Sequence, residues 1–394
     1  MRRSIISFFI IFTLILSCGI TSGCNVEDDE FPVLDFPEVS TESSFSSDVN
    51  SSLTTTDLQE ITVALPLSDE TVNLLMKLYY AKNNGLFPAE MSGADISLEY
   101  LEAINTPIVI NTVTTTSTGI TEDNLTTLRY EGIEPDIFLA GDINELIQQG
   151  LTISLDDYLF NDSSLSSYSI YTDALEALRT GEYHYGLPFY STVYMLAGSS
   201  EYLPDTGVPP FSMSQEELVD YIHTIPAYNN DGTYITKVYY SEQISELLGD
   251  DLTDTLEYEG LTASTDSFGA DPRVSRTCGM WIMNSGEFDT WSTYYPDGLY
   301  FTMLPSSVVN AVVYPLCISS TCSDPEFASD FASFLCFDKD AQMLMRRLES
   351  LRGFFPPITT RGVWEQMSTD PSFGAQSMLY EQYMSSAVYR VAED

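Results

Sequence analysis

Segments with a strand pattern alternate with segments with a helix pattern over a long stretch of this chain. Residues 61–65 run apolar and alternate as a strand does, and apolar residues from Val72 to Tyr79 then recur at helical spacing. The same order repeats twice, with strands predicted at 107–113 and 135–140 and helices predicted at 121–129 and up to Gln149. Strands joined through helices need crossover connections, so we expect an α/β fold with a largely parallel sheet.

Polar residues follow the first and the third of these predicted strands. Ser68 and Asp69 come after the first, and Gly141 and Asp142 come after the third. Ligands of open α/β sheets bind beyond the carboxyl ends of the strands, so these residues are predicted to lie on the binding edge. Asp69 and Asp142 also stand where a helix begins, so helix capping is an alternative role that can coexist with binding.

The N-terminus has the pattern of a targeting signal. Arg2 and Arg3 precede an apolar run at 5–16 that is too short to span a membrane. The small residues Thr21-Ser22-Gly23 before Cys24 resemble the lipobox of bacterial lipoproteins, in which the cysteine is lipidated after cleavage. We therefore expect a signal peptide at 1–23 and lipidation at Cys24. Lipidation at Cys18, or an ordinary secretory signal with incidental cysteines, remains an alternative.

Residues 24–57 are rich in Ser, Thr, Asp and Glu. Such a composition cannot bury enough apolar surface to offset the entropy of ordering the chain. The segment is predicted to be a disordered acidic tether that holds a folded body, beginning at about Leu58, away from a membrane surface.

Composition excludes several classes of function. Lys and Arg total 15 against 58 Asp and Glu, a net charge of −43, whereas nucleic-acid binding needs basic residues to neutralise phosphates. The two histidines, His184 and His223, are too few for a multi-histidine metal site, and no cysteine pair has zinc-site CxxC spacing. The sequence contains no Gly-x-Ser-x-Gly, P-loop or HExxH motif. We predict no enzyme activity, metal or cofactor.

Four cysteines lie in the body of the chain: Cys278, Cys317, Cys322 and Cys336. In an extracytoplasmic compartment they could pair, and Cys317 and Cys322 are close enough in sequence to bridge a loop. Buried free thiols are the other possibility, and the sequence leaves both open.

The aromatic stretch at 181–194, GEYHYGLPFYSTVY, stands between regions of alternating strands and helices. Pro188 cannot donate a hydrogen bond to a sheet, so the extended chain is expected to break there or to lie at an edge. This layout is typical of a chain that passes from one α/β lobe into a second. An ordinary buried strand with a kink is the alternative.

Several segments, in one order, resemble the extracellular solute-binding proteins of ABC importers, family 1, the group of the maltose-binding type. They are SDETVNLLMKLYYAKN, PDIFLAGDINELIQQGLTISLDDYL, GEYHYGLPFYSTVYMLAGSSEYL, PPFSMSQEELVDYI, RTCGMWIMNSGEFDTW, VYPLCISSTCSDPEFASDFASFLCFDKDAQMLM and GFFPP. Each motif alone is weak, but their shared order covers nearly all of 58–394.

The resemblance implies a two-lobed fold like that of periplasmic binding proteins, with a hinge and a central ligand cleft. The chain would cross between lobes at 187–191, 284–287 and 344–352. One lobe would comprise 58–189 and 290–343, and the other 190–289 and 344–394. The stretch between the helix predicted at 215–225 and Arg276 is shorter than in relatives, so we expect the second lobe to be reduced.

Aromatic, carboxylate and amide side chains suit a sugar, whose C–H faces stack and whose hydroxyls hydrogen-bond. The candidates at the predicted edge and crossings are Asp69, Asp142, Phe189, Tyr190, Tyr194, Trp281, Asn284, Glu287, Trp291, Arg352 and Phe355. Trp281, Trp291, Tyr190 and Phe355 are predicted to include the stacking platform. For each aromatic the alternative is core packing, and Arg352 could bind a ligand anion or pair with an acid.

The resemblance therefore implies a monomeric, lipid-anchored extracytoplasmic protein of a bacterial cell membrane. It would capture a carbohydrate and deliver it to ABC permease subunits. The alternatives are a sensory or adhesive lipoprotein with the same fold, or a glycoside hydrolase that uses a pair of its many carboxylates.

Overall fold

The computed structural model describes residues 59–88, 91–92, 95–159, 171–205, 207–240, 250–262, 271–287, 290–291, 294–295, 298–305, 311–350, 363 and 382–392. The chain divides into two compact units, Met1–Thr54 and Thr55–Asp394, and every described residue belongs to the second. The predicted tether and the predicted sites Cys24, Arg352 and Phe355 lie outside the described residues. No described helix is both long and apolar enough to cross a membrane.

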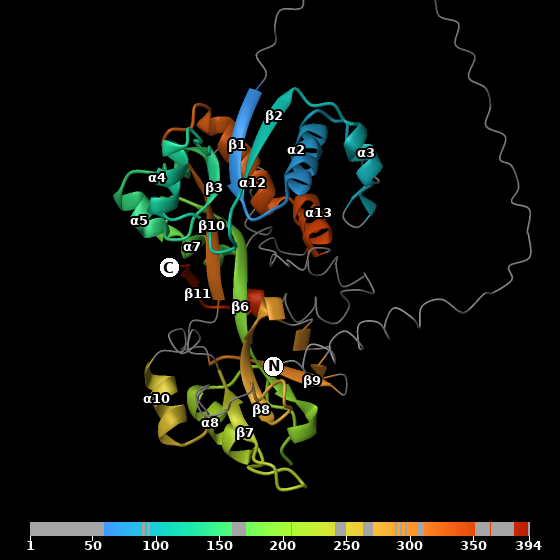
Figure 1. Ribbon diagram of the computed structural model, residues 1–394, viewed down its shortest axis with the longest axis vertical. Coiled ribbons are helices and arrows are strands. Elements are labelled where there is room, and N and C mark those ends of the chain that lie inside the picture. The colour runs from blue at the N-terminus through green and yellow to red at the C-terminus, as the bar shows by residue number, and fades with distance from the viewer. Residues whose placement is uncertain are drawn as a thin grey trace, which may run out of the picture. The chain divides into compact units, whose positions relative to one another are not determined.

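A nine-stranded mixed sheet forms the centre of the described unit (Figure 1). Its order is β2-β1-β3-β10-β6-β8-β7, with β11 paired to β10 and β9 paired to β6. The strands are β1 (Gln59–Leu65), β2 (Ile108–Thr114), β3 (Ile137–Leu139), β6 (Leu187–Ser199), β7 (Thr236–Tyr239), β8 (Cys278–Asn284), β9 (Leu299–Met303), β10 (Ala311–Ile318) and β11 (Tyr389–Val391). A separate hairpin pairs β4 (Arg179–Thr180) with β5 (Tyr183–His184).

The first three strands confirm the predicted α/β order. β1 pairs in parallel with both β2 and β3, and a helix follows each strand. The Ser68 hydroxyl oxygen accepts from the backbone N–H of Thr71 and begins α2, and Thr121 begins α4 in the same way. The helices are α2 (Asp69–Asn83), α3 (Leu98–Ala103), α4 (Glu122–Tyr130), α5 (Ile143–Gln148), α6 (Asp156–Leu159), α7 (Thr172–Glu176), α8 (Gln215–Thr224), α10 (Asp250–Tyr258), α12 (Pro325–Phe337) and α13 (Lys339–Ser350).

The expectation of a largely parallel sheet is wrong beyond these strands. β10 is antiparallel to both β3 and β6, and β6 is antiparallel to both β8 and β9. The apolar pattern predicts that a segment is a strand, but the direction of its partner depends on where a distant part of the chain returns.

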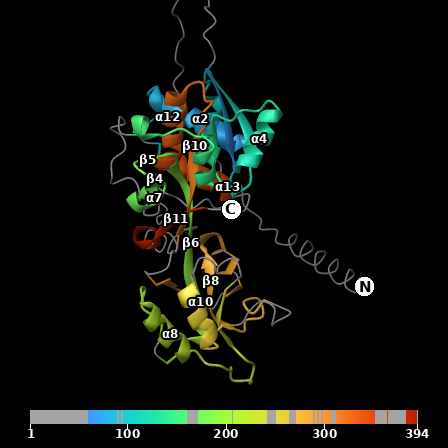
Figure 2. The ribbon, with the colours of Figure 1, turned by 90° about the vertical axis from the view of Figure 1, so that its left-hand side faces the viewer.

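Strand β6 links the two parts of the sheet (Figures 1 and 2). Its first part, up to Val193, pairs with β10, and its second part, from Tyr194, pairs with β8 and β9. The break expected at Pro188 does not occur, because the strand is continuous over 13 residues. Pro188 lies opposite Pro315, next to a shift in register, so two residues without N–H groups face each other at a β-bulge.

Separate apolar cores lie on the two parts of the sheet. Leu75 of α2, Phe331 of α12 and Leu344 of α13 are buried together in the core beside β1. Leu218 of α8 and Leu252 of α10 are buried in another, beside β7 and β8. The division into two lobes and their boundaries remain a prediction.

Candidate functional site

The carboxyl edge of the parallel strands holds the two predicted acids. Asp69 lies in the first turn of α2, where its Oδ1 accepts a hydrogen bond of 2.6 Å from the hydroxyl of Thr112. Asp142 caps α5, and its Oδ1 accepts from the N–H groups of Asn144 at 2.9 Å and Glu145 at 3.1 Å. Asp142 thus has the capping role that was the alternative to binding, whereas the capping role considered for Asp69 is wrong, because Ser68 caps α2. Binding by either acid remains a prediction.

The same edge contains a hollow that sequence reasoning missed. A space of about 420 Å³ lies between the end of β2 and α4, with Thr114, Thr115, Thr116, Asn124 and Thr127 among its lining residues. The hydroxyl of Thr115 is buried and has no hydrogen-bond partner among the described residues. A run of threonines directly after a strand is the signal that could have found it, because their hydroxyls suit polar ligands.

Tyr190 connects this edge to the central strand β6. Its side chain is buried, and its hydroxyl donates to the backbone carbonyl of Ser117 in the loop after β2. Its ring stacks on Tyr314 of β10, with centroids 4.4 Å apart and planes 16° apart. The predicted site residue Tyr190 is thus the buried member of a stacked tyrosine pair that joins β6 to β10.

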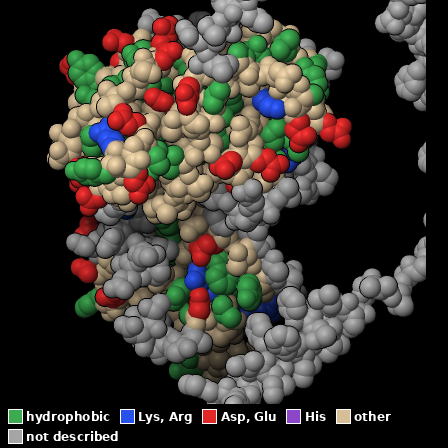
Figure 3. All heavy atoms as spheres, turned by 45° about the horizontal axis from the view of Figure 1, so that its top comes forward, with side chains coloured by type: hydrophobic (Ala, Val, Ile, Leu, Met, Phe, Trp, Pro, Cys, Tyr) green, Lys and Arg blue, Asp and Glu red, His purple; other side chains and the backbone are tan. Residues whose placement is uncertain are grey.

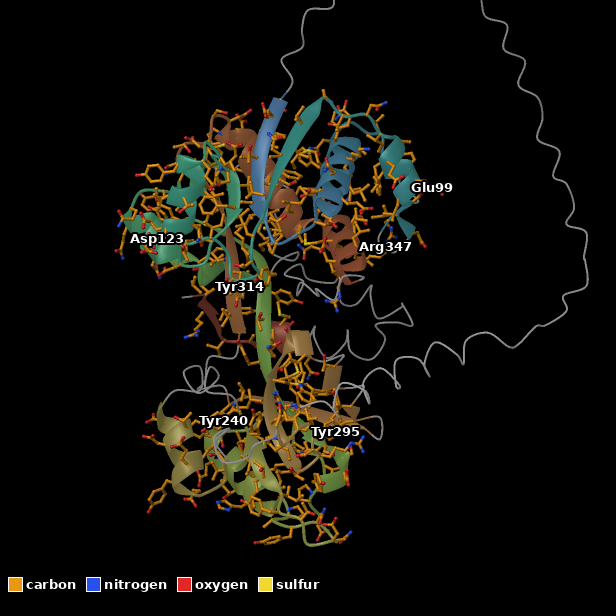
Figure 4. All side chains as sticks on the ribbon, in the orientation of Figure 1. Glu99, Asp123, Tyr240, Tyr295, Tyr314 and Arg347 are labelled. Atoms are coloured by element: carbon orange, nitrogen blue, oxygen red, sulfur yellow. The ribbon has the colours of Figure 1, made fainter. Side chains whose placement is uncertain are left out.

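One face around β6 and β10 carries half-buried polar and aromatic side chains. We call this face the polar wall and define it as Thr192, Tyr194, Asn284, Tyr314 and Arg390. Register places these side chains on one face, because Tyr194 pairs with Asn284 and Val312 pairs with both Thr192 and Arg390. Figure 4 shows Tyr314 on β10 beside β6.

The opposite face of the same strands is core. Val193 and Val313, which alternate with members of the polar wall, are buried among apolar residues. The partial exposure of the wall is therefore a property of one face and is not caused by fraying of the strands. A face of hydroxyl, amide, guanidinium and aromatic groups can bind a ligand that has both apolar C–H surface and hydroxyls.

Tyr194 is the predicted site residue at the centre of the polar wall. Burial, and then the neighbouring Tyr314, raise the pKa of Tyr194 to about 12, against a smaller opposing effect of Arg390. Its phenol is therefore protonated at neutral pH, and it can both donate and accept a hydrogen bond.

Asn284, a member of the polar wall, is the last residue of β8, and Glu287 follows it in the chain. The backbone N–H of Asn284 donates to Glu287 Oε2 at 3.1 Å, and Glu287 Oε1 lies 3.4 Å from a guanidinium nitrogen of Arg273. Arg273 also forms an ion pair of 2.8 Å with Asp271. Burial tends to lower the pKa of Arg273, but the hydrogen bonds and charge of Asp271 outweigh it and leave it raised. Arg273, which the sequence did not single out, forms an ion pair that positions the Glu287 carboxylate.

The two predicted tryptophans lie in the core beside Arg273. Trp281 is 0% exposed and Trp291 is 5% exposed. Their rings meet edge to face at 5.8 Å, Tyr295 packs on Trp281 at 5.0 Å, and the Arg273 guanidinium lies 4.4 Å over Trp291. Figure 4 shows Tyr295 beside the part of the sheet that holds β8 and β9. This is the packing arrangement that the sequence left as the alternative to a stacking platform.

The four cysteines of the body are free thiols, and Cys278, Cys317 and Cys336 are buried. Burial raises the pKa of Cys317 and of the half-buried Cys322 to about 12, and it also raises the pKa of Cys278 and Cys336. These cysteines are therefore thiols at neutral pH, without the thiolate that nucleophilic chemistry requires.

Comparison with known proteins places this architecture. No protein-family model matches the sequence, and no curated protein matches it either. Among solved structures, a sugar transporter protein from Rhizobium etli in an open conformation has a TM-score of 0.61 at 16% identity, covering 85% of this chain and 89% of its own. An extracellular solute-binding protein of family 1 from Alicyclobacillus acidocaldarius has a TM-score of 0.54 at 13% identity, covering 86% and 88%. The fold is thus that of periplasmic binding proteins.

An enzyme also has this fold. Thiaminase I from Bacillus thiaminolyticus matches with a TM-score of 0.51 at 13% identity, covering 85% of this chain and 94% of its own. The architecture alone therefore does not separate binding from catalysis, and function has to be argued from the site.

Proposed function

We propose that this protein is the extracytoplasmic solute-binding component of an ABC importer and that its solute is a carbohydrate. The observation that carries the proposal is the polar wall. Thr192 and Tyr194 stand half-exposed on β6, the strand shared by both parts of the sheet, and Tyr314 of β10 and Asn284 of β8 stand beside them on the same face. The likeness to sugar-binding proteins supports it.

The side chains of the polar wall suit a sugar. Tyrosine rings offer flat apolar surface to the C–H face of a pyranose, and their hydroxyls lie at the rim where sugar hydroxyls project. The Thr192 hydroxyl and the Asn284 amide add donors and acceptors.

A hinge between the predicted lobes would let the permease detect that a ligand is bound. A ligand that contacts both lobes stabilises the closed form, and a permease can distinguish closed from open. The lobes at 58–189 with 290–343, and at 190–289 with 344–394, are part of this proposal.

Replacing Tyr194 with alanine should weaken carbohydrate binding about ten- to a hundredfold, because an aromatic stacking contact contributes about 1–3 kcal/mol. The ligand is first found by thermal-shift screening of the folded body against a glycan panel, since a specific ligand raises Tm by mass action. Titration calorimetry then compares the variant with Tyr258→Ala, which removes a tyrosine that is 91% exposed on α10. Equal affinity in Tyr194→Ala and the wild type would place the binding site away from the polar wall. Recovery of a chemically altered ligand would favour an enzyme.

The finer part of the proposal is attachment to the cell membrane through lipid on Cys24. Replacing Cys24 with alanine should move the protein from the membrane fraction to the soluble fraction or medium, because stable anchoring needs the lipid chains. Fractionation of cells that express each variant measures this, with Cys18→Ala as the matched control. Release of Cys18→Ala with retention of Cys24→Ala would assign the lipid to Cys18.

A further inference from the structure

Arg390 lies on the polar wall although its own strand is short. β11 pairs in parallel with β10, and Arg390 stands beside Val312. Two residues on, Ala392 packs with Val312, Tyr194 and Tyr314. The flanking residues of β11 pack with the core on the other face. The Arg390 side chain is therefore on the same face as the two exposed tyrosines.

The guanidinium of Arg390 has no acidic partner among the residues that the structure describes. Its Nε is buried and has no hydrogen-bond partner there. Arg273, by contrast, is held between Asp271 and Glu287. The contrast is informative in a chain with 58 acids and 15 basic residues, and Figure 3 shows many Asp and Glu side chains and few Lys or Arg side chains on one face.

A half-buried guanidinium without a counter-ion is energetically unfavourable, because it loses water without gaining a charge-assisted hydrogen bond. The aliphatic stem of an arginine can pack on apolar neighbours such as Val312, which pairs with Arg390, but such packing leaves the Nε without a hydrogen-bond partner among the described residues. A guanidinium is a planar fork of donors that matches a carboxylate or a phosphate. An anionic ligand group would supply the missing partner.

We propose that Arg390 is a specificity-determining residue and that the ligand of the polar wall is an acidic carbohydrate, with a carboxylate or phosphate group that pairs with Arg390. The sugar ring lies against Tyr194 and Tyr314. This inference rests on the proposed function and adds to it the charge of the ligand.

The strong negative charge of the chain does not contradict an anionic ligand. Exposed charges are screened over about 8 Å at physiological ionic strength. Glu287, a described carboxylate that acts on Tyr194 of the wall, is already paired with Arg273. Of the five residues that define the polar wall, Arg390 alone carries a charge.

Titration calorimetry with matched probes tests the proposal. Digalacturonate is compared with its carboxyl-reduced neutral counterpart, and glucose 6-phosphate with glucose, so the two pairs separate a carboxylate source from a phosphate source. The wild type should bind one acidic probe at least about tenfold more tightly than its neutral counterpart. Arg390→Gln should weaken binding of that probe about ten- to a hundredfold and leave the neutral probe within about twofold.

Controls separate charge from packing. Arg390→Lys keeps a charge without the fork and should give an intermediate preference, and Arg390→Met keeps most of the apolar stem and should remain folded by circular dichroism while losing the preference. Arg179→Gln, at a half-exposed arginine paired with Glu176 on the β4–β5 hairpin, should bind as the wild type does.

Each result decides between the two proposals. If neutral carbohydrates from the panel bind and neither acidic probe binds more tightly than its counterpart, this inference is wrong and the proposed function stands. If Arg390→Gln and Arg390→Met both keep the preference for the acidic probe, the assignment of the anionic group to Arg390 is wrong. If neither probes nor panel carbohydrates bind, both proposals fail.

Discussion

Replacing Trp281 with alanine is expected to lower the free energy of unfolding by about 3–5 kcal/mol, because removal of a fully buried indole loses its packing and leaves a cavity. Trp281 is the largest of the fully buried side chains among the described residues, it is 0% exposed, and Trp291 and Tyr295 pack against it. It also pairs with Ala197 of β6, so the cavity would open beneath the strand that joins both parts of the sheet.

Urea denaturation followed by circular dichroism measures this change. Trp281→Phe should cost less, since a phenyl ring fills part of the space, and Tyr258→Ala should change stability little because Tyr258 is 91% exposed. A Trp281→Ala variant that keeps wild-type stability but loses carbohydrate binding would restore the stacking role predicted from the sequence.

Replacing Glu349 with glutamine is expected to lower the free energy of unfolding by about 2–3 kcal/mol, because its buried carboxylate is an acceptor for donors at the N-terminus of α2. Glu349 is 3% exposed. Its Oε1 accepts from the Ser68 N–H at 3.2 Å, the Ser68 hydroxyl at 3.1 Å and the Thr71 hydroxyl at 2.5 Å. A glutamine places a weaker acceptor or an NH₂ donor against these donors, so at least one hydrogen bond weakens or is lost.

The same denaturation experiment measures this effect. Glu99→Gln makes the identical substitution at an exposed position of α3, which Figure 4 shows at the periphery, and should change stability by less than about 0.5 kcal/mol. Equal loss in both variants would mean that net charge, rather than the contact with α2, causes the effect.

The sequence by itself determined the parts of this protein that depend on near neighbours. The apolar spacing at 61–65 and from Val72 to Tyr79 predicted β1 and α2, and Asp142 was correctly foreseen as the start of a helix. These features follow from the periods of strand and helix and from hydrogen bonds within one turn, which involve residues a few positions apart. The order of such elements was enough to indicate the fold.

The sequence could not separate buried aromatic residues from exposed ones. Trp281 and Tyr194 both stand in apolar strands near predicted crossings, yet one is fully buried and the other is half-exposed on the polar wall. A shift of one residue in strand register exchanges the two faces of a strand. Which face is covered is decided by segments far away in the chain.

Only the tertiary structure brought the polar wall together. Tyr194, Tyr314 and Arg390 belong to three strands, β6, β10 and β11, and β10 returns antiparallel between β3 and β6. No local pattern in the sequence marks Tyr314 or Arg390 as a site residue. Their positions follow from strand pairing between distant segments, which is fixed by how the whole sheet and its cores pack, and that packing is not a property of any short stretch of sequence.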